Sequence, residues 1–332
     1  MKAITHTRFG GPDVLHLVDI PTPEPTPDQV RVKIHASTVT SGDVKMRGFE
    51  NIPWTMALLA RPMFGFFKPR QPILGVAFAG EIDTVGQDVD SFTVGDRVFG
   101  ITGMNMGTNA QFICVPATSS ISTMPANLPF NDAAAIPFGS LTAMHFLKAG
   151  KIKQGDHVLI YGASGAVGVA AIQLAKNLGA TVTGVCSSKN LSLVQSLGAD
   201  HVIDYTQTDF AQNSQTYDIV FDTVGKTTFG KTKRVLAAKG RYLLTAFAIR
   251  HLFQMGLVNL LSKRRMVCSV STDSRDDLQQ VKAMIEAGTY RAVIDRCYPL
   301  EETAEAHRYV DGGHKVGSVV LTVAHGPGDS GD

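Results

Sequence analysis

The feature that most constrains this chain is an apolar strand that runs directly into a glycine-rich turn and a helix, HVLIYGASGAVGVAAIQLAK, at residues 157–176. HVLIY is a continuous apolar run, which is typical of a strand buried on both faces of a parallel sheet. The spacing Ala163-x-Gly165-x-x-Gly168 matches the dinucleotide fingerprint with alanine at its first glycine. Glycines let the backbone approach a pyrophosphate, and a helix N-terminus favours the anion. We therefore expect a dinucleotide to bind the turn formed by Ala163, Ser164, Gly165, Ala166, Val167 and Gly168.

A strand–helix turn without a ligand is the alternative interpretation of these glycines. The surrounding sequence favours the ligand, because strands and helices alternate from residue 127 to residue 272. The apolar runs HVLIY, TVTGV, HVIDY, DIVFDTVG, GRYLLTAF and RMVCSVS predict six strands of a parallel, doubly wound sheet. Ahead of them, residues 131–150 predict one helix that begins at Asn131 or Asp132 and stops at Gly150.

The first third of the chain has a different pattern. Residues 30–36 alternate between apolar and polar side chains, which is the period of a half-buried strand, and several short apolar runs separated by glycine follow. Many short strands with glycine turns predict a small barrel or sandwich. We expect residues 1–126 and 273–325 to form one β-rich domain, residues 127–272 a second domain, and residues 326–332 a flexible tail.

The loop after the second strand of the α/β region bears on the choice of cofactor. In NAD-binding domains an acidic residue about 20 positions after the glycines holds the ribose 2′-hydroxyl. Here the loop reads Ser187, Ser188, Lys189, Asn190 and has no carboxylate. Hydroxyl and amide donors beside one cation suit a 2′-phosphate, so the loop favours NADPH over NADH. A solvated loop that only happens to lack acid is the alternative.

Other candidate residues follow the ends of the later strands, where ligands of open α/β sheets bind. They are Tyr205 after the third strand, Val224 after the fourth, and Thr245, Ala246 and Phe247 after the fifth. Tyr205 would offer a hydroxyl or cover the adenine, or else it is a half-buried core tyrosine. The sequence leaves both interpretations open.

Several long segments, in the same order, resemble the medium-chain dehydrogenase/reductase superfamily in its zinc-independent, quinone-oxidoreductase-like branch. They are ILGVAFAGEIDTVGQDVDSFTVGDRVFG, AAAIPFGSLTAMHFL, VLIYGASGAVGVAAIQLAK, SLGADHVIDY and FDTVG. The resemblance implies a GroES-like catalytic domain built from both ends of the chain and a Rossmann cofactor domain. It also implies that Thr142 approaches the nicotinamide, with a helix-interior threonine as the alternative. Lys315, in GGHKVGS, is expected at the rim of the site.

Zinc-dependent members of the superfamily hold their metal through an early cysteine and a histidine. By motif position, Thr40 and Val76 stand at these two places, and their side chains cannot replace a thiolate and an imidazole. We therefore expect no metal. Without one, the negative charge that arrives with a hydride must be spread over the acceptor or held by hydrogen bonds. This favours quinones and α,β-unsaturated carbonyls over simple ketones.

The residues that act on the acceptor are harder to assign. SGDVKMRG places Asp43 and Lys45 just after Thr40, near the expected cleft, and we take these three as candidate catalytic residues. A structural salt bridge or a solvated loop is the alternative. Proton delivery by water or by the cofactor ribose would need none of them.

Composition bears on several classes of function. Lys and Arg number 31 and Asp and Glu 29, so the total charge gives no footprint for nucleic acid or acidic membranes. The start lacks the apolar core of a signal peptide, and no apolar run reaches the length of a membrane span. Four separated cysteines form no metal or disulfide pattern. We expect a cytoplasmic protein in a reducing compartment.

Two apolar insertions, 53–70 and 246–265, have basic ends. The favoured interpretation is that they pack in the core or in a dimer interface. A lid over an apolar acceptor pocket comes second, and transient contact with a membrane comes third. The last strand of the α/β region, RMVCSVS, resembles the edge through which relatives pair their sheets. A homodimer is therefore expected.

These observations together favour the reduction of a quinone or an α,β-unsaturated carbonyl by NADPH without zinc. An NADP-dependent alcohol dehydrogenase acting on small alcohols or aldehydes is one alternative. A nucleotide-binding sensor or partner-binding protein with little catalysis is the other.

Overall fold

The computed structural model divides the chain into two compact units, each with its own hydrophobic core. Unit 1 consists of Met1–Phe138 and Asp273–Asp332, and unit 2 of Gly139–Thr272. The structure describes residues 1–49, 61–62, 64–66, 68–126, 128–212 and 214–326.

Unit 2 is built on a six-stranded sheet with the spatial order β10-β9-β8-β11-β12-β13, in which every neighbouring pair is parallel. This is the strand order of a doubly wound dinucleotide-binding domain, with the first strand in the middle. The predicted six-stranded parallel sheet is confirmed. Its strands are β8 (His157–Tyr161), β9 (Thr181–Cys186), β10 (His201–Asp204), β11 (Tyr217–Asp222), β12 (Leu236–Leu244) and β13 (Arg265–Cys268).

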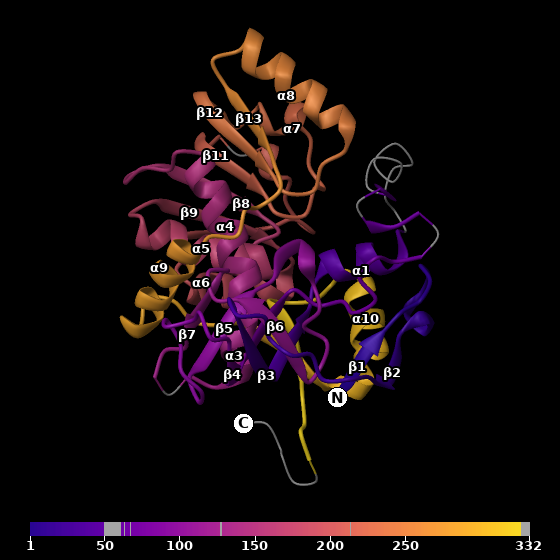
Figure 1. Cartoon of the computed structure of the whole chain (residues 1–332). Coiled ribbons are helices and arrows are strands. Elements are labelled where there is room, and N and C mark those ends of the chain that lie inside the picture. Colours follow the sequence, from indigo (N-terminus) through magenta and orange to yellow (C-terminus); the bar gives the residue numbers. More distant parts are fainter. Residues whose placement is uncertain (50–60, 63, 67, 127, 213, 327–332) are drawn as a thin grey trace. The chain divides into compact units, whose positions relative to one another are not determined.

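Helices cover the sheet of unit 2. Val158, Leu159 and Ile160 in the middle of β8 are fully buried, as expected for a strand covered on both faces. Figure 1 shows α8 lying along β13 at one end of the sheet. The helices are α5 (Ala166–Asn177), α6 (Leu191–Ser196), α7 (Phe229–Thr232) and α8 (Ile249–Leu261), with 3-10 turns at Ser188–Asn190 and Phe210–Gln212.

Unit 1 is rich in β-structure. Its main sheet has the order β14-β15-β3-β4-β5-β7, β6 pairs with β3, and β1 and β2 form a separate antiparallel pair. Alternate residues of β3, Val30, Val32 and Ile34, are fully buried, which confirms the alternation seen in the sequence. The strands are β1 (Lys2–Thr5), β2 (His16–Asp19), β3 (Gln29–Val39), β4 (Ala77–Val85), β5 (Arg97–Ile101), β6 (Phe112–Pro116), β7 (Ile121–Thr123), β14 (Ile294–Pro299) and β15 (Ser318–Thr322).

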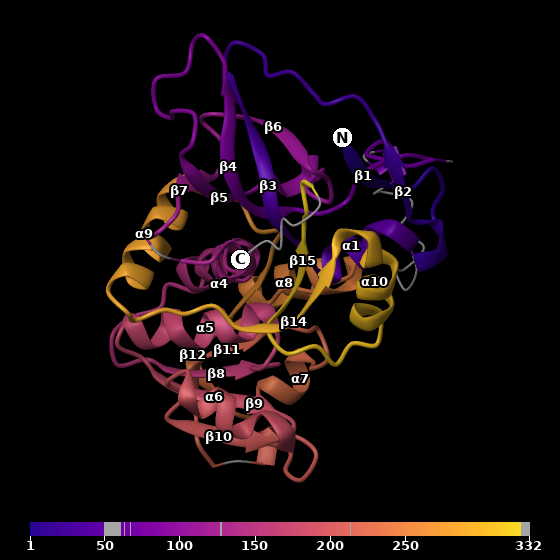
Figure 2. The same ribbon diagram turned by 90° about the horizontal axis from the view of Figure 1, so that it is seen from below.

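The end of the chain returns to this sheet. β15 runs antiparallel to β3, with Val320 opposite Thr38. Figure 2 shows α1 (Ser41–Gly48) beside α10 (Thr303–Asp311), and the two helices are in contact. The GroES-like β-rich fold from both ends of the chain is confirmed. Unit 1 also contains α9 (Arg275–Glu286), and 3-10 turns lie at Pro12–Val14, Gly103–Asn105 and Leu300–Glu302.

The single helix predicted for residues 131–150 is wrong. The segment forms two helices, α3 (Phe130–Ala135) and α4 (Pro137–Ala149). The break falls at Pro137, which has no N–H to continue a helix and favours a new helical start. α3 begins after Pro129 rather than at Asn131 or Asp132, and it contacts β3 and β4. α3 lies within unit 1, which extends to Phe138 in the division into compact units.

Two of the sequence predictions fall on segments with little description. The tail 326–332 lies outside the described residues except for Gly326, and so does much of the first insertion, including Trp54. Elsewhere, all four cysteines are free thiols. Within the described ranges, the helices are too short or too polar to cross a bilayer.

Candidate functional site

The glycine-rich turn between β8 and α5 is shaped by close backbone contacts. Gly162 has a φ of +82°, and a Cβ there would lie 2.7 Å from Thr223 Oγ1. A Cβ on Gly168 would lie 2.2 Å from the carbonyl oxygen of Gly162. Because no side chain fits at this distance, glycine is what allows α5 to approach β8 here.

Gly165 differs from these neighbours because the space above it is open. A Cβ on Gly165 would have the Gly162 carbonyl oxygen as its nearest neighbour, at 3.6 Å, which is an ordinary contact. Gly165 is the N-cap of α5, and no side chain of the described residues caps this end of the helix. The first-turn N–H groups of Ala166, Val167 and Gly168 are therefore available to an anion such as pyrophosphate.

Asn190 joins the glycine turn to the loop after β9. Its side-chain amide donates to Ser164 Oγ at 3.0 Å and to Ser187 Oγ at 3.4 Å. Lys189, beside it, is exposed. The structure thus brings residues 163–168 and 187–190 together, as a dinucleotide that spans both segments would require.

A carboxylate that the sequence analysis missed faces the same loop. Asp204, the last residue of β10, accepts hydrogen bonds from the hydroxyls of Ser188 and Thr206, and these bonds lower the pKa of its carboxyl group. Residues 187–190 contain no acid, as expected, but the fold brings the Asp204 carboxylate against this loop. The expectation that the loop has no acidic neighbour is therefore wrong. The register of the parallel strands, with Asp204 opposite Cys186, is the signal that could have identified it.

Asp222, at the end of β11, organises the loop that carries Val224. Its buried carboxylate accepts from the backbone N–H groups of Val224 at 3.0 Å, Gly225 at 2.7 Å and Thr227 at 2.9 Å. Burial raises the pKa of this carboxyl group although the backbone bonds oppose the shift. The N–H of Thr245 donates to the Asp222 carbonyl, so the ends of β11 and β12 are held together. Sequence reasoning gave Asp222 no role, although a carboxylate that ends a buried apolar strand was a usable signal.

The other candidates of unit 2 lie around these strand ends. A Cβ on Gly225 would lie 2.7 Å from Ala246 Cβ, so the loops after β11 and β12 touch. Tyr205 is 51% exposed, and the core interpretation of this residue is wrong. Val224 is exposed as well, whereas Phe247 packs half-buried against the core of unit 2.

Thr142 lies on α4 just after a close contact between two helices. A Cβ on Gly139 would lie 2.4 Å from the carbonyl oxygen of Ala166, so the start of α4 touches the first turn of α5. Thr142 is half-buried about one helical turn later. The contact brings Thr142 close to the candidate pyrophosphate turn.

Lys315 belongs to unit 1 and precedes β15. Its ammonium group donates to the carbonyl oxygen of Gly317 at 2.6 Å. Desolvation lowers the pKa of Lys315 to about 8, so its charge is titratable at mildly alkaline pH.

In unit 1, Thr40 and Asp43 form a closed hydrogen-bonded pair at the start of α1. Thr40 is the N-cap, and its hydroxyl accepts from the N–H groups of Gly42 and Asp43. The Asp43 carboxylate accepts from the N–H of Thr40 at 2.7 Å, from its hydroxyl at 2.6 Å, and from the N–H of Gly75 at 3.0 Å. Burial raises the pKa of the Asp43 carboxyl group. The pair ties α1 to the residue before Val76.

The burial of this pair limits what it can touch. Thr40 and Asp43 are both buried, and every polar atom of their side chains already has a partner inside unit 1. Lys45, which follows on α1, is exposed. Of the three candidate catalytic residues, only Lys45 has an accessible functional group.

The donor chemistry at the two zinc positions does not fit a zinc ion. The Thr40 hydroxyl is committed to Asp43, and Val76 offers no ligand atom. In the part of the chain that the structure describes, no three His, Cys, Asp or Glu side chains form a group that could hold a metal.

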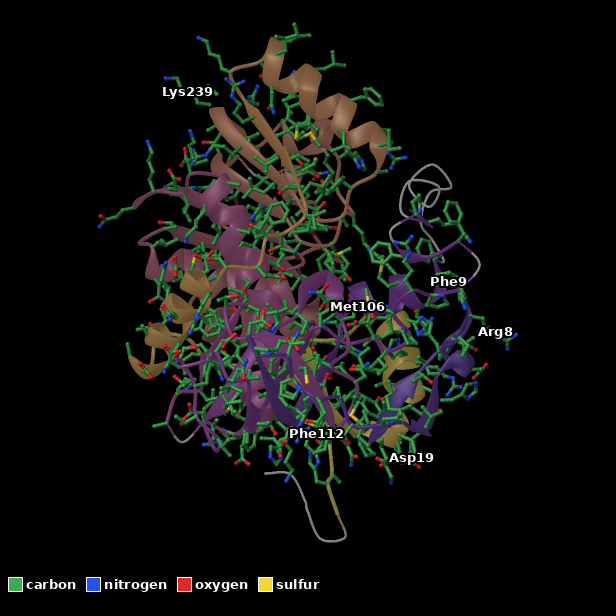
Figure 3. All side chains as sticks on the ribbon, in the orientation of Figure 1. Arg8, Phe9, Asp19, Met106, Phe112 and Lys239 are labelled. Carbon is green, nitrogen blue, oxygen red and sulfur yellow. The ribbon has the colours of Figure 1, made fainter. Side chains whose placement is uncertain are left out.

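Unit 1 also contains a pocket of about 280 Å³ with both polar and apolar lining residues. Met46 of α1 lines it, so the helix that Thr40 and Asp43 fix at its start forms part of the wall. Figure 3 labels two other lining residues, Phe9 and Met106. The apolar lining consists of Phe9, Met46, Phe64, Leu74, Met104 and Met106.

His6 supplies a polar atom to this pocket. Its Nδ1 lies 2.9 Å from the carbonyl oxygen of Pro72, which can only accept, so Nδ1 carries the proton and Nε2 is an acceptor. Burial lowers the pKa of His6, which keeps the ring neutral at neutral pH. The sequence analysis missed His6, because the bridge between Thr5 and Ile73 that sets it beside Pro72 is a long-range contact without a local motif.

Three family models match the chain. "Alcohol dehydrogenase GroES-like domain" matches residues 26–126, and "Alanine dehydrogenase/PNT, C-terminal domain" matches residues 132–237. "Zinc-binding dehydrogenase" matches residues 197–321.

Known proteins match along most of their length. "NAD(P)H oxidoreductase RTN4IP1, mitochondrial" of Danio rerio is 31% identical over 330 residues, which cover 90% of this chain and 84% of that protein. "2-methylene-furan-3-one reductase" of Solanum lycopersicum is 30% identical over 337 residues, which cover 97% of this chain and 79% of that protein. The solved structure of the quinone oxidoreductase from Coxiella burnetii is 31% identical with a TM-score of 0.86, over 98% of this chain and 99% of that one.

Proposed function

Because the chain belongs to the medium-chain dehydrogenase/reductase superfamily, in its quinone-oxidoreductase-like branch, we propose that it reduces quinones or α,β-unsaturated carbonyls with a nicotinamide dinucleotide. The observation that carries the proposal is the open space above Gly165 beside the uncapped first turn of α5. The names of two relatives, a quinone oxidoreductase and a 2-methylene-furan-3-one reductase, cover both acceptor classes. When bound, the reduced nicotinamide supplies a hydride from its C4 atom.

The residues of unit 2 divide between the two halves of the dinucleotide. We assign residues 163–168 to the pyrophosphate and residues 187–190, with Tyr205, to the adenosine half. The carboxyl ends of β11 and β12 carry Val224, Thr245, Ala246 and Phe247, and these lie where open α/β sheets bind ligands. Together with Thr142 they are assigned to the nicotinamide half. Lys315 belongs to unit 1, and its role at the site stays a prediction from the sequence.

NADPH is the dinucleotide that we propose. Lys189 is exposed and supplies a cation, and Ser187 and Asn190 supply hydrogen-bond donors for a 2′-phosphate. Asp204 opposes this choice by its charge, but its oxygen atoms already accept from Ser188 and Thr206. The balance between Lys189 and Asp204 is therefore the feature to test.

The side chains of unit 1 favour an acceptor that can delocalise the negative charge it gains with the hydride. A hydride transfer leaves charge on the acceptor, and Thr40 and Val76 offer no ligand set for a Lewis acid. Quinones and α,β-unsaturated carbonyls delocalise this charge onto oxygen as a phenolate or an enolate. We assign Thr40 and Asp43 to positioning α1, and Lys45 to orienting the acceptor.

The acceptor is proposed to occupy the pocket of unit 1 that His6, Phe9 and Met46 line. Its volume of about 280 Å³ suits a small ring system or a short enone. His6 Nε2 can accept a hydrogen bond from the hydroxyl group of a reduced product, and Gln71 and Asn105, which also line the pocket, carry amide donors for a carbonyl.

The chain is further proposed to form a homodimer in the cytoplasm. β13 is the last described strand of the unit 2 sheet, which suits pairing with a second copy. The Asn259 side chain of α8 already bonds the N–H and the carbonyl of Met266, so the second copy would pair with the remaining backbone groups of this edge. All four cysteines are free, as in a reducing compartment. Light scattering of the purified chain tests the dimer.

Turnover of phenanthrenequinone and of 1-octen-3-one, with NADPH and chelator-treated protein, tests the proposed reaction. We expect NADPH to be consumed with at least one of them, at a rate that the chelator does not change. Tight NADPH binding without turnover of either acceptor would contradict the reductase and favour a nucleotide-binding protein. Oxidation of small alcohols by NADP⁺ instead would identify an alcohol dehydrogenase.

A further inference from the structure

The surface of α8 has an apolar side that the proposed reduction does not use. Phe253, Leu257, Leu260 and Leu261 are 72%, 60%, 79% and 78% exposed. Their spacing of three and four residues sets them on one side of the helix, and we call these four residues the α8 ridge. Met255 and Val258 pack against the core of unit 2 instead. The sequence favoured packing in the core or in a dimer interface for this insertion. Core packing is wrong for the ridge, and the dimer interface stays a prediction.

The segment around the ridge is strongly basic. Residues 223–272 contain ten Lys or Arg and no Asp or Glu. Subtracting these ten from the total of 31 leaves the rest of the chain with 21 Lys or Arg against 29 Asp or Glu. The near-balanced total thus hides a segment with ten cations and no carboxylate, of which Lys231 and Arg241 pair with Asp209 and Asp156 outside the segment. The total charge alone therefore does not decide whether this segment contacts an acidic surface.

Two exposed lysines of this segment lie on β12 and after the end of α8. Lys263 follows the helix almost directly, and Lys239 lies on β12; both are exposed. Arg241 is opposite Arg265 in the parallel pair of β12 and β13, and it forms an ion pair with Asp156. Figure 3 shows Lys239 projecting from this end of unit 2. Lys263 therefore places a cation at the carboxyl end of the ridge.

We propose that α8 docks unit 2 on an anionic lipid surface. The α8 ridge would enter the boundary between headgroups and acyl chains, while Lys239 and Lys263 face the lipid phosphates. Helices that lie in a membrane interface combine an apolar side with flanking cations in this way. Each cation near an acidic leaflet adds about 1 kcal/mol of attraction, so the charge is as important as the ridge.

A second copy of the chain fits this surface less well. A twofold interface through this surface would bring the same basic segment of both copies together, including Lys239 and Lys263. Residues 223–272 contain no carboxylate that could pair with them. Like charges in contact weaken such an interface, whereas acidic headgroups neutralise the same cations.

Binding of the full-length chain to vesicles tests the proposal. One set of vesicles is phosphatidylcholine, and the other is equal parts phosphatidylcholine and phosphatidylglycerol. We expect binding to the mixed vesicles at low salt, and a loss of about tenfold or more at high salt or on phosphatidylcholine alone, since screening acts on the charge contribution.

Two double variants separate the two contributions. L257Q/L260Q keeps residues of good helix propensity and should lose about tenfold or more on both kinds of vesicle. K239E/K263E should lose binding only on the mixed vesicles. V94Q, at a residue of unit 1 that is 67% exposed, and K2E are the matched controls and should bind like the wild type. Unchanged melting temperature and unchanged quinone turnover in solution verify that each variant is folded.

Three results would overturn the proposal. They are absence of wild-type binding to the mixed vesicles, equal binding by all variants, and conversion of a dimer into monomers by L257Q/L260Q. The last result would make the ridge an interface between copies. If a variant unfolds, the dependence of wild-type binding on salt and lipid charge decides the question.

Discussion

The two candidate sites of this chain differ in what they are made of. In unit 2 the pyrophosphate turn depends on missing side chains: Gly162 and Gly168 permit close backbone contacts, and Gly165 leaves a space open. In unit 1 the start of α1 depends on side chains, because the buried groups of Thr40 and Asp43 bond to each other and to Gly75. A site defined by the backbone should respond to added atoms, and a site defined by buried polar groups should respond to charge and protonation.

The largest expected effect is a loss of stability in acid that comes from unit 1. His307 is fully buried, and its Nδ1 accepts from Arg47 at 3.2 Å. Burial lowers the pKa of His307 from 6.5 to about 3. Between pH 6.5 and about pH 3, His307 therefore binds a proton in the unfolded chain but not in the folded chain. The free energy of unfolding is at its full value above pH 6.5 and falls towards pH 3, by up to about 1.4 kcal/mol per pH unit.

Urea unfolding across this pH window measures the effect. His307→Gln keeps an acceptor for Arg47 but has no titrating group, so its stability should depend less on pH than that of the wild type. Equal pH dependence in the two proteins would show that His307 does not titrate as the structure indicates.

Asp43→Asn should have the next largest effect. The amide would turn one acceptor atom into a donor that faces the donors of Thr40 or Gly75, at a cost of about 2 kcal/mol in the free energy of unfolding. We expect kcat to fall moderately and the dissociation constant of NADPH to stay constant, because Asp43 positions α1. Lys45→Gln, at an exposed residue of the same helix, is the control for stability. Full loss of kcat without loss of stability would mean that Asp43 takes part in the reaction itself.

Gly165→Ala tests the open space in unit 2. The added Cβ has room within the protein, so stability should stay the same, but it would enter the space assigned to the pyrophosphate. We expect the dissociation constant of NADPH, measured by calorimetry, to rise about tenfold. Gly168→Ala is the contrasting variant, because its Cβ meets backbone at 2.2 Å and should destabilise the fold by about 1–3 kcal/mol. An unchanged dissociation constant of NADPH in Gly165→Ala would show that the cofactor does not bind at this turn.

The smallest effect is expected from the loop after β9. Lys189→Ala should weaken NADPH binding by about fivefold and leave NADH binding almost unchanged, since an exposed ion pair contributes at most about 1 kcal/mol. Asp204→Asn should strengthen NADPH binding relative to NADH, because it removes the carboxylate opposite Ser188. Equal changes for both dinucleotides in both variants would remove the argument for the 2′-phosphate.

The sequence predicts the parts of this molecule that rest on local rules. The spacing of Gly165 and Gly168 in a strand–helix turn identifies the pyrophosphate turn, and the alternation of strands and helices identifies the sheet. Local rules do not predict the roles of Asp204 and His6, because the neighbours of each residue are set by pairing with strands that are distant in sequence. The helix break at Pro137 was in principle readable, since proline cannot continue the hydrogen-bond ladder.

Burial is the other quantity that local patterns leave undecided. Asp43 is close to Thr40 in sequence, but only the long-range contact with Gly75 shows that its carboxylate is closed off from an acceptor. The apolar residues of α8 give the opposite case. Their helical spacing is that of a core helix, yet the side that carries Leu260 and Leu261 is exposed.

Transfer of deuterium to an enone tests the proposed reaction at the level of a single bond. Chelator-treated protein is incubated with NADPH that carries deuterium at C4 and with 1-octen-3-one, and the product is analysed by mass spectrometry. We expect one deuterium on the carbon β to the carbonyl group when the transferred face of the nicotinamide is labelled. An unlabelled product from both labelled faces, or the absence of product with both the enone and a quinone, would contradict the proposed hydride transfer.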